Sequence, residues 1–174
     1  MQVMTTDEAP AALLADVRLL LNDAFDGDFS DDDWQHTLGG WHVIGTDAGA
    51  VVSHAAIVPR RIGVGEDSFA AGYVEGVATR PDRQRQRLGS MVMTGAADVI
   101  RREFGLGVLS NSSHDFYRRL GWERWQGPTF VRSGGQLVRT DDEDDGIMVL
   151  RFGPSQEADL TAAISCDSRP GDDW

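Results

Sequence analysis

The segment from Tyr73 to Ser90 constrains the fold more than any other part of this chain. Its sequence, YVEGVATRPDRQRQRLGS, passes from an apolar run through an arginine-rich turn directly into a helical pattern. Four arginines (Arg80, Arg83, Arg85 and Arg87) fall within eight residues of a chain whose formal net charge is -12. The first turn of a helix adds unpaired backbone N–H groups and the positive end of the helix dipole. This strand, turn and helix predict a site for an anionic group, such as a pyrophosphate.

Length and composition predict one compact domain over residues 1–174. A chain of 174 residues with 41% hydrophobic content can bury one substantial core. Its apolar runs are too short to span a bilayer, and the first ten residues lack the pattern of a signal peptide, so we expect a soluble cytoplasmic protein that does not bind membranes. The single cysteine, Cys166, excludes an internal disulfide, and no pair of cysteines is available for a zinc site. We therefore expect no metal.

The charged residues exclude several classes of enzyme and indicate the charge of a partner. All sixteen basic residues are arginine, so the chain has no lysine for a P-loop, a kinase or a Schiff base. Nineteen of the 28 acidic residues lie in the terminal stretches 1–33 and 141–174. These stretches form either a solvated acidic surface or a negative cleft for a cationic ligand. Both readings argue against binding to nucleic acid.

The N-terminal half predicts two helices followed by three strands. Apolar residues from Leu13 to Leu21 follow helical spacing after Pro10, and Ser30 with Asp33 resembles a capping box that starts a second helix ending near Gly39. Turn residues then separate the segments WHVIGT, AVVSHAAIVPRRIGV and SFAAGYVEGVAT. We expect these three segments to form consecutive antiparallel strands.

The second half predicts a parallel crossover. Apolar spacing indicates a helix over 88–104, and the LGVLS segment that follows at 106–110 is typical of a buried strand. A strand, helix and strand in this order form a βαβ crossover, which makes the two strands parallel neighbours. A short helix in SSHDFYRRLG and strands in WERWQGPTFV and IMVLRF follow, whereas 155–174 has little periodicity and reads as an irregular tail. The fold class is α/β, with a mixed sheet and helices on its faces.

The order of elements and several motifs resemble a known family. The GCN5-related N-acetyltransferases (GNAT) carry the motif Gln/Arg-x-x-Gly-x-Gly/Ala at this turn, and the matching run here is Gln84-Arg85-Gln86-Arg87-Leu88-Gly89, in which Arg87 stands at a glycine position. The segments GDFSDDDWQHTLGG, GYVEGVATR, GWERWQGPT and CDSRPGDDW are similar to those of the aminoglycoside 2'-N-acetyltransferases. The resemblance implies a GNAT fold over 1–174, with a mostly antiparallel central sheet and helices on both faces.

The resemblance also implies a donor and its binding residues. In this family acetyl-CoA lies along the strand before the turn, as an added strand would. Its pyrophosphate meets the N–H groups of the turn and of the helix start. Carried over to this sequence, the acetyl-CoA site comprises Val77, Ala78, Thr79, Gln84, Arg85, Gln86, Arg87, Leu88 and Gly89. The alternative is that the arginines only solubilise an exposed turn.

Acetyl transfer to an amine needs a base for the amine proton and an acid for the departing thiolate. By resemblance, Glu75 is the base, acting directly or through a water, and Tyr117 is the acid. A carboxylate at Glu75 between the apolar Val74 and Val77 is costly unless it is functional or paired. The alternatives are that Glu75 is an ordinary strand residue facing solvent and that Tyr117 only packs.

The implied acceptor is a cationic aminosugar, which carboxylates recognise through charge-assisted hydrogen bonds. The C-terminal carboxylate of Trp174 is an expected ligand, and the tail over 155–174 is expected to contribute to the substrate site. The resemblance also implies a homodimer. The substrate residues that it indicates are Asp28, Glu75, the backbone of Gly76, Ser110, Glu143, Asp144, Asp172 and Trp174.

Two other functions stay open at this stage. The same fold and donor could serve another small amine or a protein N-terminus, or the chain could hold CoA or a cationic sugar without turnover. The histidines lack the spacing of metal ligands and are assigned to packing or the surface. Cys166 is assigned to structure rather than to nucleophilic catalysis, and the tryptophans to the core or to a dimer contact.

Overall fold

The computed structural model describes all residues from Met1 to Trp174. Their contacts group into two compact units. Unit 1 comprises Met1–Val58 and Val74–Val99, and unit 2 comprises Pro59–Tyr73 and Ile100–Trp174. Because two long strands and one helix contribute to both units, the chain passes between the units within these elements. We describe each unit by itself.

Helices and strands are mixed along the chain, and several strands follow one another directly. Besides three short 3-10 turns (η1 Pro81–Arg83, η2 Asp141–Glu143 and η3 Gly153–Ser155), they are β1 Gln2–Thr5, α1 Ala11–Ala24, α2 Asp31–His36, β2 Trp41–Asp47, β3 Ala50–Val64, β4 Asp67–Thr79, α3 Leu88–Glu103, β5 Leu106–Ser110, α4 His114–Arg118, β6 Glu123–Arg124, β7 Thr129–Ser133, β8 Gln136–Arg139, β9 Ile147–Leu150 and β10 Ile164–Asp167.

The two N-terminal helices form where the sequence predicts them. Helix α1 begins directly after Pro10 and buries Val17, Leu20 and Leu21 on one face. Helix α2 begins at a capping box, because the Ser30 hydroxyl accepts from the Asp33 amide while the Asp33 carboxylate accepts from the Ser30 amide. This reciprocal pair satisfies two backbone donors that the helix start would otherwise leave open.

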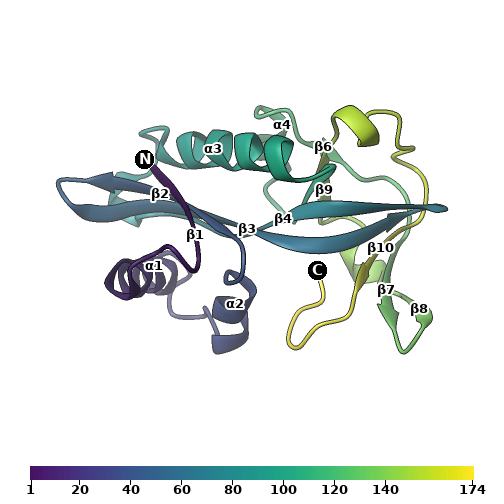
Figure 1. The fold of residues 1–174 in the computed structure, drawn as a ribbon, viewed down its shortest axis with the longest axis horizontal. Coiled ribbons are helices and arrows are strands. Elements are labelled where there is room, and N and C mark those ends of the chain that lie inside the picture. Colours follow the sequence, from purple (N-terminus) through teal and green to yellow (C-terminus); the bar gives the residue numbers. More distant parts are fainter. The chain divides into compact units, whose positions relative to one another are not determined.

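Unit 1 places helices on both faces of its strands (Figure 1). Strands β1, β2 and β3 pair antiparallel, with Val43 opposite Val3 on one side and Ala55 on the other. Ile44 packs in a cluster with residues of α1 and α2, whereas its neighbour Val43 faces Gly95 of α3. Consecutive strand residues point to opposite faces, and both faces here are therefore buried under helices.

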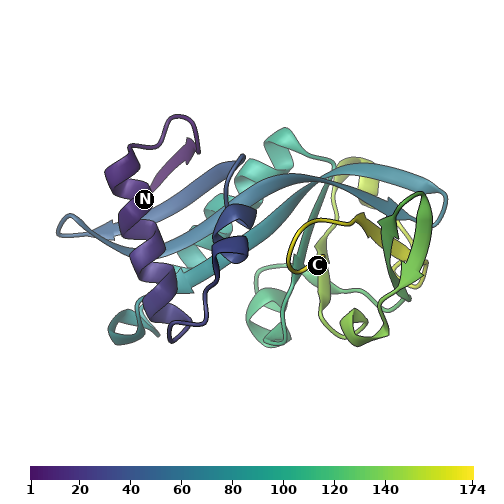
Figure 2. The same cartoon turned by 90° about the horizontal axis from the view of Figure 1, so that it is seen from below.

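The ten strands belong to one sheet, in which the strands that contribute to unit 2 have the order β6-β9-β5-β4-β3-β10-β7-β8. Strands β4 and β5 are parallel, with Tyr73 opposite Val108, which confirms the predicted crossover through α3. The other neighbouring pairs are antiparallel except β10 and β7, which run parallel side by side (Figure 2). The expected α/β class with a mixed, mostly antiparallel sheet is confirmed.

The sequence analysis did not predict three of the strands. One of these, β10, lies in the stretch that was predicted to be irregular, so that prediction is corrected here. The stretch 155–174 is not irregular throughout, because Ile164–Asp167 forms β10, which pairs with both β3 and β7. Its first three residues are all buried, so the short run lacks the alternation that would have indicated a strand. The other two, Gln2–Thr5 and Gln136–Arg139, are short and largely exposed.

Candidate functional site

The arginine-rich turn has the backbone conformation that its motif requires. Arg87, which occupies a glycine position of the motif, has φ 64°, and Arg85 has φ 62°. Left-handed backbone costs a residue with a side chain about 1–2 kcal/mol, so tertiary structure must hold both arginines in place. The position at which the motif has glycine is thus left-handed here, a conformation that glycine adopts without strain.

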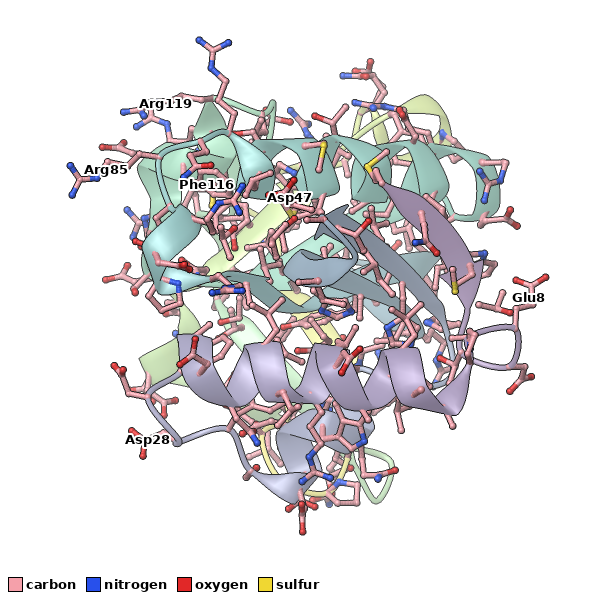
Figure 3. The ribbon with its side chains drawn as sticks, turned by 90° about the vertical axis from the view of Figure 1, so that its left-hand side faces the viewer. Glu8, Asp28, Asp47, Arg85, Phe116 and Arg119 are labelled. Carbon is pink, nitrogen blue, oxygen red and sulfur yellow. The ribbon has the colours of Figure 1, made fainter.

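The charges of the turn fall into two groups. Arg83 bonds Asp47 at 2.7 Å and Gln86 at 3.2 Å, while Arg80 pairs with Asp82 at 3.0 Å, so these two arginines hold the turn itself. Arg85 and Arg87 are exposed and make no ion pair, and Figure 3 shows Arg85 directed away from the ribbon. Two guanidinium groups are thus left for a ligand.

The start of α3 supplies backbone donors beside these arginines. The first bond of the helix runs from the amide of Met91 to the carbonyl of Arg87. The amides of Leu88, Gly89 and Ser90 therefore lack an acceptor within the helix. Backbone N–H groups and a helix dipole of sixteen residues, rimmed by two arginines, fit the pyrophosphate of acetyl-CoA.

The conformation and the charge of Arg87 can be separated by mutation. Arg87→Gly keeps the left-handed backbone and removes the charge, whereas Arg87→Ala also forces a Cβ into that conformation. We expect both variants to weaken CoA binding about 3- to 10-fold, and only Arg87→Ala to keep the strain of the parent chain. Titration calorimetry with CoA and urea unfolding measure the two effects. Unchanged CoA affinity in both variants would contradict a phosphate contact at Arg87.

Glu75 lies in the part of β4 that belongs to unit 1, and it is half-buried after the buried Val74. The next residue, Gly76, has φ 54° in mid-strand, and a Cβ there would lie 2.9 Å from Cγ2 of Thr37. Only glycine fits both the conformation and the space. The strand therefore changes its backbone direction directly beside Glu75. Val77, Ala78 and Thr79 continue β4 to its end before the turn.

The sequence prediction assigned the histidines to packing or to the surface. One of them, His54, contacts this part of β4, and a second, His42, contacts His54. His54 Nδ1 lies 2.8 Å from the carbonyl oxygen of Gly76, and His54 Nε2 lies 3.0 Å from Nδ1 of His42. Both imidazoles are fully buried. The hairpin of β2 and β3 places them diagonally on one face, because His54 pairs with Ile44 and His42 with Ala56. The sequence alone could have indicated that the two histidines lie close together only if the register of the β2–β3 hairpin had been predicted correctly.

Tyr117 lies in unit 2, on α4, and its side chain is buried. Its ring packs edge-on against Phe116 and Trp122. Burial raises the pKa of Tyr117 to about 12, because desolvation disfavours the phenolate. The phenol therefore keeps its proton at neutral pH and acts as a hydrogen-bond donor.

Four of the predicted substrate residues come together in unit 2. The Ser110 hydroxyl donates to Glu143 Oε2 at 3.4 Å. Desolvation and the nearby charge of Asp172 raise the pKa of Glu143. Trp174 is buried, and its indole N–H donates to the hydroxyl of Thr140, which caps the 3-10 turn that contains Glu143. The C-terminus thus lies against the acidic loop.

Asp144 behaves differently from Glu143 although it is the next residue. Its carboxylate pairs with Arg139 and accepts from the amide and hydroxyl of Thr129. The Arg139 guanidinium lowers the pKa of Asp144 to about 2. These bonds connect the acidic loop to β7 and β8. The carboxylate of Asp144 therefore has a structural role in the protein without bound ligand.

The last residues are anchored by Arg60 rather than frayed. Its guanidinium donates to the carbonyl oxygens of Asp173 and Asp167, each at 2.6 Å, and lies over the ring of Tyr73. Cys166, which is buried with a pKa raised to about 11, also donates to the carbonyl of Asp173. A thiol with a raised pKa is a poor nucleophile, in agreement with a structural role.

The remaining predicted residue, Asp28, belongs to unit 1. It is exposed in the loop after α1 and points away from the ribbon (Figure 3). The structure has no group of three or more His, Cys, Asp or Glu side chains that could hold a metal ion. No helix is long and apolar enough to cross a membrane.

Comparison with known proteins gives consistent results at the level of fold and sequence. The model of the acetyltransferase (GNAT) domain family matches residues 7–125. The chain is 43% identical over 161 residues to the aminoglycoside 2'-N-acetyltransferase of Mycolicibacterium fortuitum, which covers 90% of this chain and 83% of that protein.

Two solved structures have a similar fold at low sequence identity. The GNAT family N-acetyltransferase YhbS from Escherichia coli, in complex with CoA, has a TM-score of 0.68 at 16% identity and covers 95% of this chain and 88% of its own. A GNAT family acetyltransferase from Brucella melitensis, in complex with acetyl-CoA, has a TM-score of 0.62 at 17% identity and covers 94% and 93%. The chain spans about a third of the length of several longer proteins of solved structure that it also matches.

The family match covers more than half of the chain and includes β4, the arginine-rich turn and α3. The relative of known activity extends the similarity over most of the remainder. The resemblance seen in the sequence is confirmed: the chain is an acetyltransferase of the GNAT family and a relative of the aminoglycoside 2'-N-acetyltransferases.

Proposed function

We propose that this enzyme transfers the acetyl group of acetyl-CoA to the 2'-amino group of aminoglycosides. The observation that carries the proposal is the 43% identity over 161 residues to an enzyme of that activity. The geometry supports it within each unit. Unit 1 offers a pyrophosphate cradle beside a strand with a glutamate, and unit 2 offers an acidic loop that the C-terminus covers.

Acetyl-CoA supplies the activated acetyl group as a thioester. We assign its pantetheine to the backbone of Val77, Ala78 and Thr79 and its pyrophosphate to the turn from Gln84 to Gly89. Within this turn, Arg85 and Arg87 are the side chains without an ion partner, and they are therefore the ones that can pair with phosphate oxygens.

Glu75 is proposed to accept the proton of the substrate ammonium, directly or through a water. An ammonium has no lone pair for attack on a thioester, so its proton must leave before or during the step. A half-buried carboxylate in a rigid strand is held in one place, which favours proton transfer in a fixed geometry.

Tyr117 is proposed to stabilise the departing thiolate by a hydrogen bond. A phenol with a pKa of about 12 is a weaker acid than a thiol of about 8.5. Complete transfer of its proton to a thiolate would therefore be uphill. A donated hydrogen bond carries no such cost, so the structure supports this form of acid assistance in place of full protonation.

Recognition of a polycationic aminosugar is proposed to rest on carboxylates, chiefly those of the acidic loop and of the C-terminal segment. Glu143 and Asp172 lie close enough for the charge of one to raise the pKa of the other, and a cationic amine would relieve this repulsion. Asp144 is already engaged by Arg139, so we assign the contact in this loop to Glu143. Further ligands proposed by resemblance are Asp28, Glu75, the Gly76 backbone, Ser110 and the carboxylate of Trp174.

Three further properties of the enzyme are proposed only from its relative and from the family resemblance: antibiotic resistance, the oligomeric state and the location in the cell. Acetylation of an aminoglycoside removes one of its cationic amines, so we infer that the enzyme confers resistance to these antibiotics. We further infer a homodimer, by resemblance, and a cytoplasmic location, since the donor is an intracellular metabolite.

Product mapping tests the proposed function in one experiment. The enzyme is incubated with acetyl-CoA and an aminoglycoside that carries a free 2' amine, thiol release is followed, and the acetylated position is read by mass spectrometry and NMR. We expect one acetyl group at the 2' nitrogen and no thiol release with an aminoglycoside that has a 2' hydroxyl. Turnover only with polyamines or peptide N-termini would favour another GNAT substrate, and CoA binding without thiol release would favour a binding protein.

A further inference from the structure

A chain of hydrogen bonds crosses the interior of unit 1 and ends on the backbone beside Glu75. It begins at the Gly39 amide, which donates to the Thr6 hydroxyl at 3.0 Å. The Thr6 hydroxyl lies 2.9 Å from His42 Nε2, and the two imidazoles and the Gly76 carbonyl follow at 3.0 and 2.8 Å. Neither imidazole has a role in the chemistry described above.

The polarity of this chain follows from the chemistry of its last member. A carbonyl oxygen only accepts, so His54 Nδ1 must carry a hydrogen. In a neutral imidazole the other nitrogen then accepts, which requires a hydrogen on Nδ1 of His42 and leaves His42 Nε2 to accept from Thr6. The Thr6 hydroxyl also lies 3.4 Å from the Gly40 carbonyl, a longer alternative to its 2.9 Å contact with His42. The Gly76 carbonyl fixes both histidines as the tautomer with hydrogen on Nδ1.

Burial keeps both rings in the neutral form that this order requires. Desolvation lowers the pKa of His42 to about 4. Desolvation, followed by the neighbouring His42, lowers the pKa of His54 to about 3 against the opposing effect of the Gly76 bond. Near neutral pH neither ring takes up a second proton, so Nδ1 remains the donor and Nε2 the acceptor in each ring.

This series of hydrogen bonds cannot serve as a proton relay to Glu75, because its last member, a peptide carbonyl, neither stores nor passes on a proton at neutral pH. Its effect must be on geometry. Gly76 has φ 54°, and Thr37 and Leu21 close the space beside its α-carbon. The hydrogen bond from His54 fixes the direction of the Gly76 carbonyl. The backbone nitrogen of Gly76 is bonded to Glu75, so the orientation of Gly76 also affects that of Glu75.

We propose that His54, held in one tautomer by His42, is a positioning residue that fixes the Gly76 peptide and thereby the carboxylate of Glu75. The proposal rests on the proposed role of Glu75 as base. It identifies the two buried imidazoles as part of the support for the catalytic strand and distinguishes them from ordinary core residues.

Two variants of similar size separate the hydrogen bond from packing. Asn places an amide nitrogen where His54 has Nδ1, so His54→Asn can still donate to Gly76, whereas His54→Leu cannot. We expect His54→Leu to lower kcat about 10-fold or more while KM for acetyl-CoA changes less than about twofold, and His54→Asn to restore kcat to within about threefold of the parent. The acidic limb of the pH profile of kcat/KM for the aminoglycoside should shift in His54→Leu only. Equal kcat in the two folded variants would overturn the proposal.

A second measurement does not depend on turnover. Long-range ¹H–¹⁵N NMR spectra report the tautomer of each imidazole, with resonances assigned from the single histidine variants. We expect His42 and His54 to be neutral and protonated on Nδ1 at pH 7, and His42 to lose that preference in His54→Leu. An Nε2-protonated or cationic His54 would overturn the proposal even in an active enzyme. If the parent releases no thiol while the tautomers are as expected, the proposed function fails and the hydrogen-bonded chain stands.

Discussion

Replacement of Glu75 by Gln is expected to lower kcat for an aminoglycoside by about 10²- to 10³-fold. The amide has almost the same shape as the carboxylate and cannot accept a proton, so the amine would lose its base while β4 keeps its packing. Because the proposed acetyl-CoA residues lie further along the strand and in the turn, the affinity for CoA should change less than about twofold. Steady-state thiol release and calorimetry with CoA measure the two quantities.

Tyr117→Phe is the matched comparison for this variant. A phenol that only donates a hydrogen bond to a thiolate should contribute about 10-fold to kcat, well below the effect at Glu75. The acidic limb of the rate profile should vanish in Glu75→Gln and persist in Tyr117→Phe. Unchanged turnover in Glu75→Gln would remove this residue as the base, and a larger loss in Tyr117→Phe would reverse the two assignments.

Periodicity and local signals were enough to predict the elements that carry the donor site. The strand, turn and helix from Tyr73 to Ser90 form as expected, and β4 and β5 are parallel because a helix connects them. The capping box at Ser30 was readable from two residues. These features depend on short sequence separations, within which side-chain chemistry largely decides the backbone.

The features that escaped prediction depend on contacts distant in sequence. Strand β10 has only four residues, and it becomes a strand because β3 and β7 lie on both sides of it. The link between Glu143 and the C-terminus passes through Thr140 and Trp174, which are 34 residues apart. The histidine pair depends on the register of a hairpin and on a glycine 22 residues away. No local pattern encodes such contacts.

The same histidine pair should make the protein sensitive to mild acid. Both imidazoles have a lower pKa in the folded state than the ordinary value of 6.5. Above pH 6.5 both states are neutral, and the pair causes no pH dependence. Below pH 6.5 the unfolded state binds protons that the folded state excludes, so the free energy of unfolding falls as pH falls, until the pH reaches the folded pKa values of about 4 and about 3.

The expected loss approaches about 1.4 kcal/mol per pH unit for each histidine, or about 3 kcal/mol for the pair between pH 6.5 and pH 5.0, because an unfolded imidazole is only half protonated at pH 6.5. Carboxylates with a lowered pKa affect the free energy of unfolding at lower pH. Asp144, for example, loses its stabilising contribution as the pH falls from its ordinary pKa of 3.8 to its folded pKa of about 2. Glu143 acts with the opposite sign, because its pKa is raised and the folded state binds its proton more tightly. The same carboxylates are present in a variant that lacks only the two imidazoles, so the difference between the two proteins isolates the imidazoles.

Urea unfolding of the parent and of a His42→Asn/His54→Asn variant at several pH values from 7.5 to 5.0 measures this loss. The variant has no imidazole in the chain, keeps an amide donor at each position and shares all other titrating groups with the parent. Its stability above pH 6.5 should be somewhat lower, and the difference between the two proteins should shrink and then reverse as the pH falls. Parallel pH curves would mean that the two rings take up protons in the folded protein as readily as in the unfolded chain. Protonated rings would break the single order of donors and acceptors that holds the Gly76 carbonyl.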